Sequence, residues 1–158
     1  MPKTIAIALS GGIDSLMAAY LLKEQGHHVI EEMIREYFLV CHRMSDHIVL
    51  IYQEMHSLPV NWRNKVMENE EKITDLFVNV LEALMRKRAL PPIEKRVINL
   101  AAHNISVLGH MWAFRRWMLS DRYTIDEYIK IQTGFILKLM SNNQGPSLKG
   151  TTAKREGK

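Results

Sequence analysis

Two groups of residues in this chain have types and spacings that suit chemistry. The first is the run SGGIDS at residues 10–15. Glycines in such a turn let backbone N–H groups converge on an anion, and a helix after the turn adds the positive end of its dipole. An apolar, β-branched run at residues 3–9 predicts a buried strand before the turn. The arrangement predicts a phosphate-binding loop.

The second group is a stripe of polar side chains in an otherwise apolar helix. Asn99, His103, Ser106 and His110 follow one another at spacings of four, three and four, so they share one helix face. Residues 97–114 carry no formal charge, and five polar side chains lie among these 18 residues. A membrane span needs about 20 predominantly apolar residues. We therefore predict a buried central helix rather than a span.

Helical periodicity continues along the chain from Ile30. Apolar residues from there to Met55 are spaced alternately by four and three, which predicts one helix running to residue 57, because Pro59 blocks its continuation. Pro59 is suited to begin the next helix, and the central helix spans residues 93–119. A capping box of Thr124 and Glu127 starts the last helix. The predicted apolar face of this helix consists of Ile125, Tyr128, Ile129, Gln132, Phe135, Ile136 and Leu139.

Composition argues against several classes of function. The chain of 158 residues has a net charge of +4, but residues 142–158, a predicted disordered basic tail, hold +3 of it. The remaining +1 is no basic excess of the kind that marks a nucleic-acid-binding surface. The single cysteine, Cys41, excludes an internal disulfide and suits the cytoplasm, and no signal peptide is legible. His42 and His47 are five residues apart, which is the wrong spacing to share a metal ion, so we expect none.

The first group of residues carries a resemblance to a known family. The stretch KTIAIALSGGIDSLMAAYLLKEQGHHVI resembles the opening strand, loop and helix of the N-type ATP pyrophosphatases, and is most similar to the tRNA 2-thiouridylases. The resemblance ends near Ile30, and the rest of the sequence does not have the pattern of the further βαβ units that this fold requires. The family's pair of sulfur-transfer cysteines is also missing. What the resemblance implies is binding of an ATP phosphate at Ser10, Gly11, Gly12, Asp14 and Ser15.

A second resemblance covers residues from about 30 to 140. The long helix REYFLVCHRMSDHIVLIYQEMHSLP and the block AAHNISVLGHMWAFRRWMLSDRYTIDEYIKIQTGFIL resemble the C-terminal regulatory domain of TetR-family transcriptional repressors. The resemblance implies ligand binding, and dimerisation of the last two helices as a four-helix bundle. The family's N-terminal helix-turn-helix is absent from this sequence, so we expect no sequence-specific DNA binding by this chain alone.

These observations predict a mainly all-α protein, a helical bundle of the TetR C-terminal-domain type. Residues 1–29 would be an ATP-pyrophosphatase-like strand–loop–helix remnant, 30–141 the regulatory domain and 142–158 the tail. We interpret the chain as a ligand-binding and dimerisation domain rather than an enzyme. Two alternatives stay open: an ATP-dependent tRNA 2-thiouridylase-like protein working by adenylation, and a helical interaction protein without ligand. Length of coverage favours the first interpretation, since about 110 helical residues cannot be reassigned to a parallel sheet. ATP is the one cofactor left open, and no membrane partner is expected.

The expected sites lie on several helices. A pocket for a small apolar or acyl-like molecule is expected. Large apolar side chains on the last two helices would stay exposed in a monomer, which predicts a homodimer. A central glycine costs about 1 kcal/mol of helix propensity, which the close approach of another helix would explain. The candidate pocket residues are Tyr37, Met44, Ile48, Phe77, His103, Ser106, His110 and Met111, and the candidate dimer contacts are Gly109, Trp112, Trp117, Ile129, Phe135 and Ile136.

Overall fold

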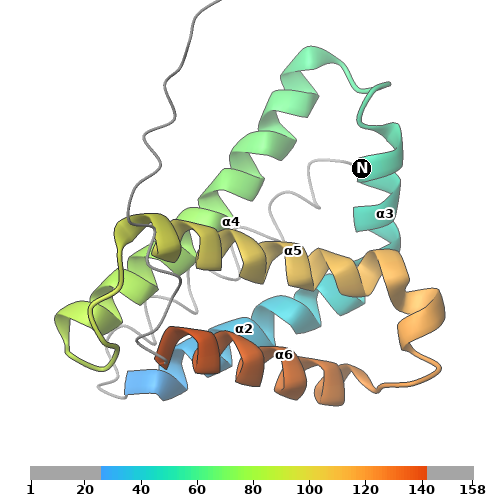
Figure 1. Ribbon diagram of the computed structural model, residues 1–158. Coiled ribbons are helices and arrows are strands. Elements are labelled where there is room, and N and C mark those ends of the chain that lie inside the picture. The colour runs from blue at the N-terminus through green and yellow to red at the C-terminus, as the bar shows by residue number, and fades with distance from the viewer. Residues whose placement is uncertain (1–25, 142–158) are drawn as a thin grey trace, which may run out of the picture.

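The computed structural model describes residues 26–141, which form five helices and no strand (Figure 1). The predicted all-α bundle is confirmed for this part of the chain. The predicted strand at residues 3–9, the loop at 10–15 and the tail at 142–158 lie outside the described residues. The helices are α2 (Gly26–Arg43), α3 (Ser45–Glu54), α4 (Val60–Arg86), α5 (Lys95–Leu119) and α6 (Ile125–Ser141).

Helix α5 lies at the centre of the bundle, as its apolar sequence predicts. It packs against α2, α3, α4 and α6, and only α2 contacts as many of the described helices. Figure 1 shows α5 and α6 running across the bundle, with α4 crossing α5 and projecting beyond it. The side chains of α5 that the chain buries completely or nearly so are Ile98, Ala102, Ile105 and Trp112. They pack with Ile30, Ile34, Tyr37, Phe38, Phe77 and Leu81 of α2 and α4.

The prediction of one unbroken helix from Ile30 to residue 57 is wrong. Helix α2 ends at Arg43, Met44 adopts φ −100° and ψ 13°, and α3 starts at Ser45. The Ser45 hydroxyl donates hydrogen bonds to the carbonyl oxygens of Cys41 (3.0 Å) and His42 (2.8 Å). A serine side chain that bonds the preceding turn competes with the backbone ladder and bends a helix. The apolar residues keep their spacing of four and three through the bend. This spacing therefore cannot reveal that the direction of the helix axis changes.

The beginnings of the later helices agree with the sequence. Pro59 stands directly before α4 at its N-cap position. The capping box before α6 is confirmed, since the Thr124 N–H donates to Glu127 Oε2 (2.8 Å) and the Glu127 N–H donates to Thr124 Oγ1 (3.2 Å). The hydrogen bonds that the Thr124 N–H and the Thr124 hydroxyl donate to the Glu127 carboxylate lower the pKa of Glu127.

The predicted apolar face of α6 is buried only in part. Tyr128, Ile129 and Ile136 are buried within the chain, whereas Phe135 and Leu139 are exposed. Thr133 and Met140 are buried in their place. The buried face is therefore rotated toward residues 129, 133, 136 and 140, and a second apolar face of α6 points to solvent.

Candidate functional site

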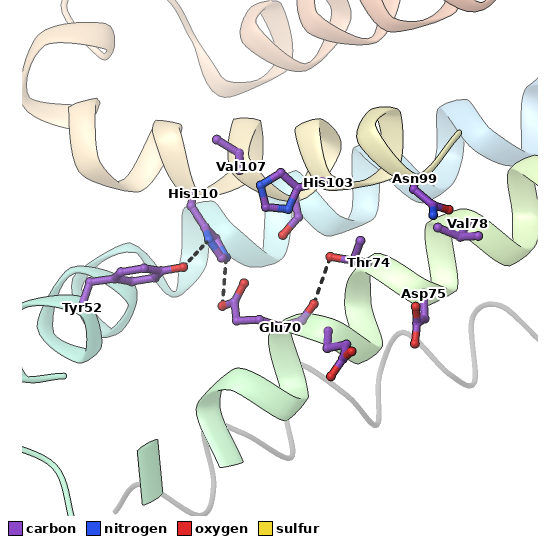
Figure 2. A pocket seen from close by; sticks show the side chains of 11 residues that line it. Tyr52, Glu70, Thr74, Asp75, Val78, Asn99, His103, Val107 and His110 are labelled. Atoms are coloured by element: carbon purple, nitrogen blue, oxygen red, sulfur yellow. Dashed lines mark hydrogen bonds and ion pairs between the residues drawn. The ribbon is translucent and has the colours of Figure 1, made fainter. Parts of the chain in front are cut away.

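A half-open pocket of about 390 Å³ lies between α4 and α5, with one residue from α3 at its edge (Figure 2). Its volume is within the range of small-molecule sites. We call it the α4–α5 pocket. It is lined by Tyr52 of α3, by Glu70, Glu71, Thr74, Asp75 and Val78 of α4, and by Asn99, His103, Ser106, Val107 and His110 of α5.

The polar stripe of the central helix forms one wall of this pocket. Asn99, His103, Ser106 and His110 all line it, because their common face on α5 is turned toward α4. Helix α5 holds them in place by burying the neighbouring face, at Ile98, Ala102 and Ile105, in the core. The structure thus brings together residues that the sequence grouped only by spacing.

The other five candidate pocket residues lie elsewhere. Tyr37 stands behind the α5 wall and reaches Ser106 and His110 through its hydroxyl. Phe77 and Ile48 are buried in the core, and Met44 is partly buried against it. Met111 points outward from α5. The core residues were chosen as apolar members of the helical seams, and such residues are the ones that a bundle buries.

The α4 wall was missed by the sequence analysis. Its polar residues belong to a helix whose apolar face, at Ile73, Phe77 and Val80, is buried against the bundle. The only available clue was that Glu70 and Thr74 lie one turn apart beside that apolar face. Polar residues in that position usually form a solvated helix face, and only the placement of α5 turns them into the lining of a pocket.

His110 and Ser106 are the most buried polar residues of the described pocket wall, each at 4% exposure. The Nε2 of His110 lies 3.1 Å from the Tyr37 hydroxyl and its Nδ1 lies 3.3 Å from the Tyr52 hydroxyl. Tyr37 donates its own proton to the Ser106 carbonyl oxygen (3.3 Å). All these groups are satisfied when His110 carries its proton on Nε2, donates it to Tyr37, and accepts from Tyr52 at Nδ1. Burial lowers the pKa of His110 to about 4, so the imidazole is neutral at pH 7.

Glu70 faces His110 across the pocket, and its Oε1 lies 3.7 Å from His110 Nε2 (Figure 2). This distance is too long for a hydrogen bond. Burial raises the pKa of Glu70 to about 7, while it lowers that of His110. The two shifts favour the neutral forms of both groups, so the close contact is not an ion pair at neutral pH. Among residues 26–141, no lysine or arginine lines the pocket.

Other candidate chemistries find little support in the described part of the chain. Residues 26–141 contain no cluster of three or more His, Cys, Asp or Glu side chains able to hold a metal ion. His42 Nδ1 accepts a hydrogen bond from Trp112 Nε1 (2.8 Å), which fixes that ring to the core. Burial raises the pKa of the Cys41 thiol to about 12, so it stays protonated and unreactive.

None of the helices described between residues 26 and 141 is long and apolar enough to cross a membrane.

Four of the candidate dimer contacts need a correction. A Cβ at Gly109 would lie 2.6 Å from Tyr37 Cε1 and 3.0 Å from Cys41 Sγ, so the close helix approach is made by α2 of the same chain. Trp112, Ile129 and Ile136 are buried within the chain and offer almost no surface to a second subunit. Trp117 and Phe135 do remain exposed, at 71% and 61%. The five candidate ATP-binding residues, Ser10 to Ser15 without Ile13, lie outside the described residues.

Comparison with known proteins gives one family match and several matches to other proteins over short segments. The family model described as "Tetracyclin repressor-like, C-terminal domain" matches residues 24–139. The tRNA-specific 2-thiouridylase MnmA of Hydrogenobaculum sp. is 36% identical over 85 residues, which is 47% of this chain and 24% of that protein. The enzyme of the same name from Mycoplasmopsis pulmonis is 61% identical over 33 residues, which is 21% of this chain and 9% of that protein. The one from Clostridium acetobutylicum is 63% identical over 30 residues, which is 19% of this chain and 8% of that protein.

The chain therefore spans a quarter or less of the length of these curated relatives. No solved structure matches it. The family match covers the described helices almost completely, from two residues before α2 to two residues before the end of α6.

Proposed function

Because the chain belongs to the family of tetracyclin repressor-like C-terminal domains, we propose that it is the ligand-binding and dimerisation domain of a TetR-like transcriptional regulator. The observation that carries this proposal is the α4–α5 pocket, whose lining residues are mostly polar and include the buried His110. We place the protein in the cytoplasm, where the buried Cys41 thiol would stay reduced.

The hydrogen bonds of His110 support a sensing role. Through Tyr52 they connect the pocket to α3, and through Tyr37 they connect it to α2. Tyr37 in turn packs edge-on against Phe77 of α4, with ring centroids 5.5 Å apart. A ligand that moves His110 must therefore disturb groups on three other helices. A domain that passes ligand occupancy to a distant partner needs such a connected and well-packed network.

The ligand-binding part of this proposal is tested by a thermal-shift screen of small cations, anions and neutral compounds on the full chain. We expect some compounds to raise the unfolding temperature of the wild type and to lose this effect in a His103→Trp variant. His103 is exposed on the pocket wall, so a larger ring there fills the pocket without disturbing the core. Lys130→Trp on the exposed side of α6 is the control and should keep the response. Identical responses of the wild type and His103→Trp to every compound would contradict the proposal.

Dimerisation is supported by apolar surface that the chain does not cover. Leu100 and Phe135 are 60% and 61% exposed, on the two helices that follow each other at the end of the described chain. Further exposed apolar residues on the same helices are Val97, Met111, Ile131 and Leu139. Apolar surface of this kind marks association sites, and domains of this family typically dimerise. We infer that a second copy of the chain covers it.

The short matches to tRNA-specific 2-thiouridylases favour a second candidate, ATP binding at residues 10–15. We expect Mg-ATP to bind weakly or not at all, because that fold needs further parallel strands and residues 26–141 contain none. Isothermal titration calorimetry with Mg-ATP measures this. Micromolar binding that disappears in Asp14→Ala would contradict the expectation and support the enzyme-like alternative.

A further inference from the structure

The formally charged side chains in the lining of the α4–α5 pocket, as far as residues 26–141 form it, are all acidic. Glu70, Glu71 and Asp75 line it from α4, and the basic side chains among these described lining residues are two histidines of α5. Of these, His110 is neutral at pH 7. Val78 and Val107 are the aliphatic residues of the described lining, and Tyr52 adds an aromatic ring. The acyl-like acid that the sequence suggested would meet three carboxylates, and a wholly apolar ligand would leave these carboxylates without a partner.

Glu70 is the group in this lining that most needs a partner. Its side chain is 32% exposed, and its closest ionisable neighbour is His110 at 3.7 Å. Within residues 26–141 no side chain or backbone group donates a hydrogen bond to its carboxylate, because Thr74 donates to its backbone carbonyl instead. A carboxylate that is mostly removed from water without a donor or a cation costs free energy. Burial raises the pKa of this carboxylate to about 7.

We propose that the α4–α5 pocket selects a small organic cation, an alkylammonium group on a compact body, with Glu70 as its counter-ion. The proposal rests on the proposed ligand-binding function and specifies the chemical class of the ligand. An ammonium group supplies the hydrogen-bond donors and the positive charge that the described lining lacks. Glu71 and Asp75, one residue and about one turn further along α4, add to the negative field at the pocket mouth.

Three probes with the same naphthyl body and different head groups test this preference. They are 1-naphthylmethylamine, 1-naphthalenemethanol and 1-naphthaleneacetate, titrated calorimetrically into the full chain at pH 8. We expect the amine to bind about tenfold or more tightly than the alcohol, because a hydrogen bond to a charged group is worth about that factor in affinity. We expect the acetate to bind more weakly than both.

Variants of α4 then locate the counter-ion. Glu70→Gln keeps the shape of the side chain and removes its charge, so it should lower the affinity for the amine about tenfold while leaving that for the alcohol unchanged. Glu68→Gln, on the exposed side of the same helix and outside the lining, is the matched control and should leave both affinities unchanged. Circular dichroism confirms that each variant keeps its helix content.

The pH dependence of amine binding gives an independent readout. The pKa of Glu70 is raised to about 7, so its carboxylate is protonated below that pH and charged above it. An alkylammonium stays charged from pH 6 to 8.5. The groups that face Glu70 are Glu71 and Asp75 of α4, His103 and His110 of α5, and Tyr52 of α3. Affinity for the amine should therefore rise as the pH increases through about 7, and this rise should be lost in Glu70→Gln.

The outcomes separate this inference from the proposed function. Tighter binding of the alcohol or the acetate than of the amine would overturn the inference, and so would an unchanged amine affinity in Glu70→Gln or no binding of any probe. In each of these cases the thermal-shift screen with His103→Trp still decides whether the pocket binds small molecules. If that screen fails as well, the proposed function is overturned too.

Discussion

Gly109→Leu is expected to destabilise the folded chain by about 3 kcal/mol or more, the upper range for overpacking a tight core. Even the first added carbon would lie 2.6 Å from Tyr37 Cε1. Tyr37 cannot move aside, because it is 1% exposed, packs against Phe77, and is hydrogen-bonded to Ser106 and His110. The cost therefore falls on the core and on the pocket wall together. Urea unfolding followed by circular dichroism at fixed protein concentration measures it.

Two alanine variants provide a matched comparison for this prediction. Alanine is a better helix former than glycine by about 1 kcal/mol. At Gly134 of α6, an added Cβ meets no atom within 4 Å, so Gly134→Ala should stabilise the protein by up to that amount. At Gly109 the steric clash should outweigh the gain, so Gly109→Ala should be net destabilising. Equal stabilisation by both variants would show that α2 and α5 are not as close as the structure has them.

The spacing of hydrophobic residues in the sequence determines some features of this fold and leaves others open. A 3.6-residue period identifies a helix and its buried stripe, so the central helix could be predicted. The start of α4 near Pro59 and the capping box of Thr124 and Glu127 could be predicted from residue types that favour helix starts. The period does not register a bend, because apolar residues on both sides of Met44 keep the same spacing. Nor does it decide between two apolar faces of one helix. Helix α6 has two, and only its packing against α2 selects the buried one.

The pocket shows the same division. Its α5 wall is unusual within one helix, since polar residues interrupt an apolar run, and this was visible at Asn99, His103, Ser106 and His110. The polar residues of its α4 wall are ordinary for a surface helix, and they line a pocket only because α5 packs beside them. Glu70 is an ordinary surface residue in the sequence and a partly buried carboxylate in the bundle. Electrostatics that arise from two helices meeting are a property of tertiary structure, so single-helix patterns could not predict them.

Charging the exposed apolar faces of α5 and α6 is expected to convert a dimer into a monomer. In sedimentation velocity at tens of micromolar, the wild type should have twice the chain mass of 18.3 kDa, and a Leu100→Glu/Phe135→Glu double variant should have the mass of one chain. Both side chains are about 60% exposed in the single chain, so their replacement should not disturb its core. Each large apolar side chain buried by a partner contributes about 1.5–3 kcal/mol. Because both subunits carry the variant, two such side chains are lost from each, which weakens association by roughly four orders of magnitude or more.

The control for this prediction is Leu50→Glu. Leu50 is 55% exposed, like the two substituted residues, but it belongs to α3 rather than to the final pair of helices. It should leave the dimer intact, because the inferred contact surface does not include α3. If Leu50→Glu dissociates the dimer as fully as the double variant does, then the subunits meet through another surface. If the wild type itself sediments as one chain, the apolar faces of α5 and α6 have some role other than self-association, and the dimerisation part of the proposed function fails.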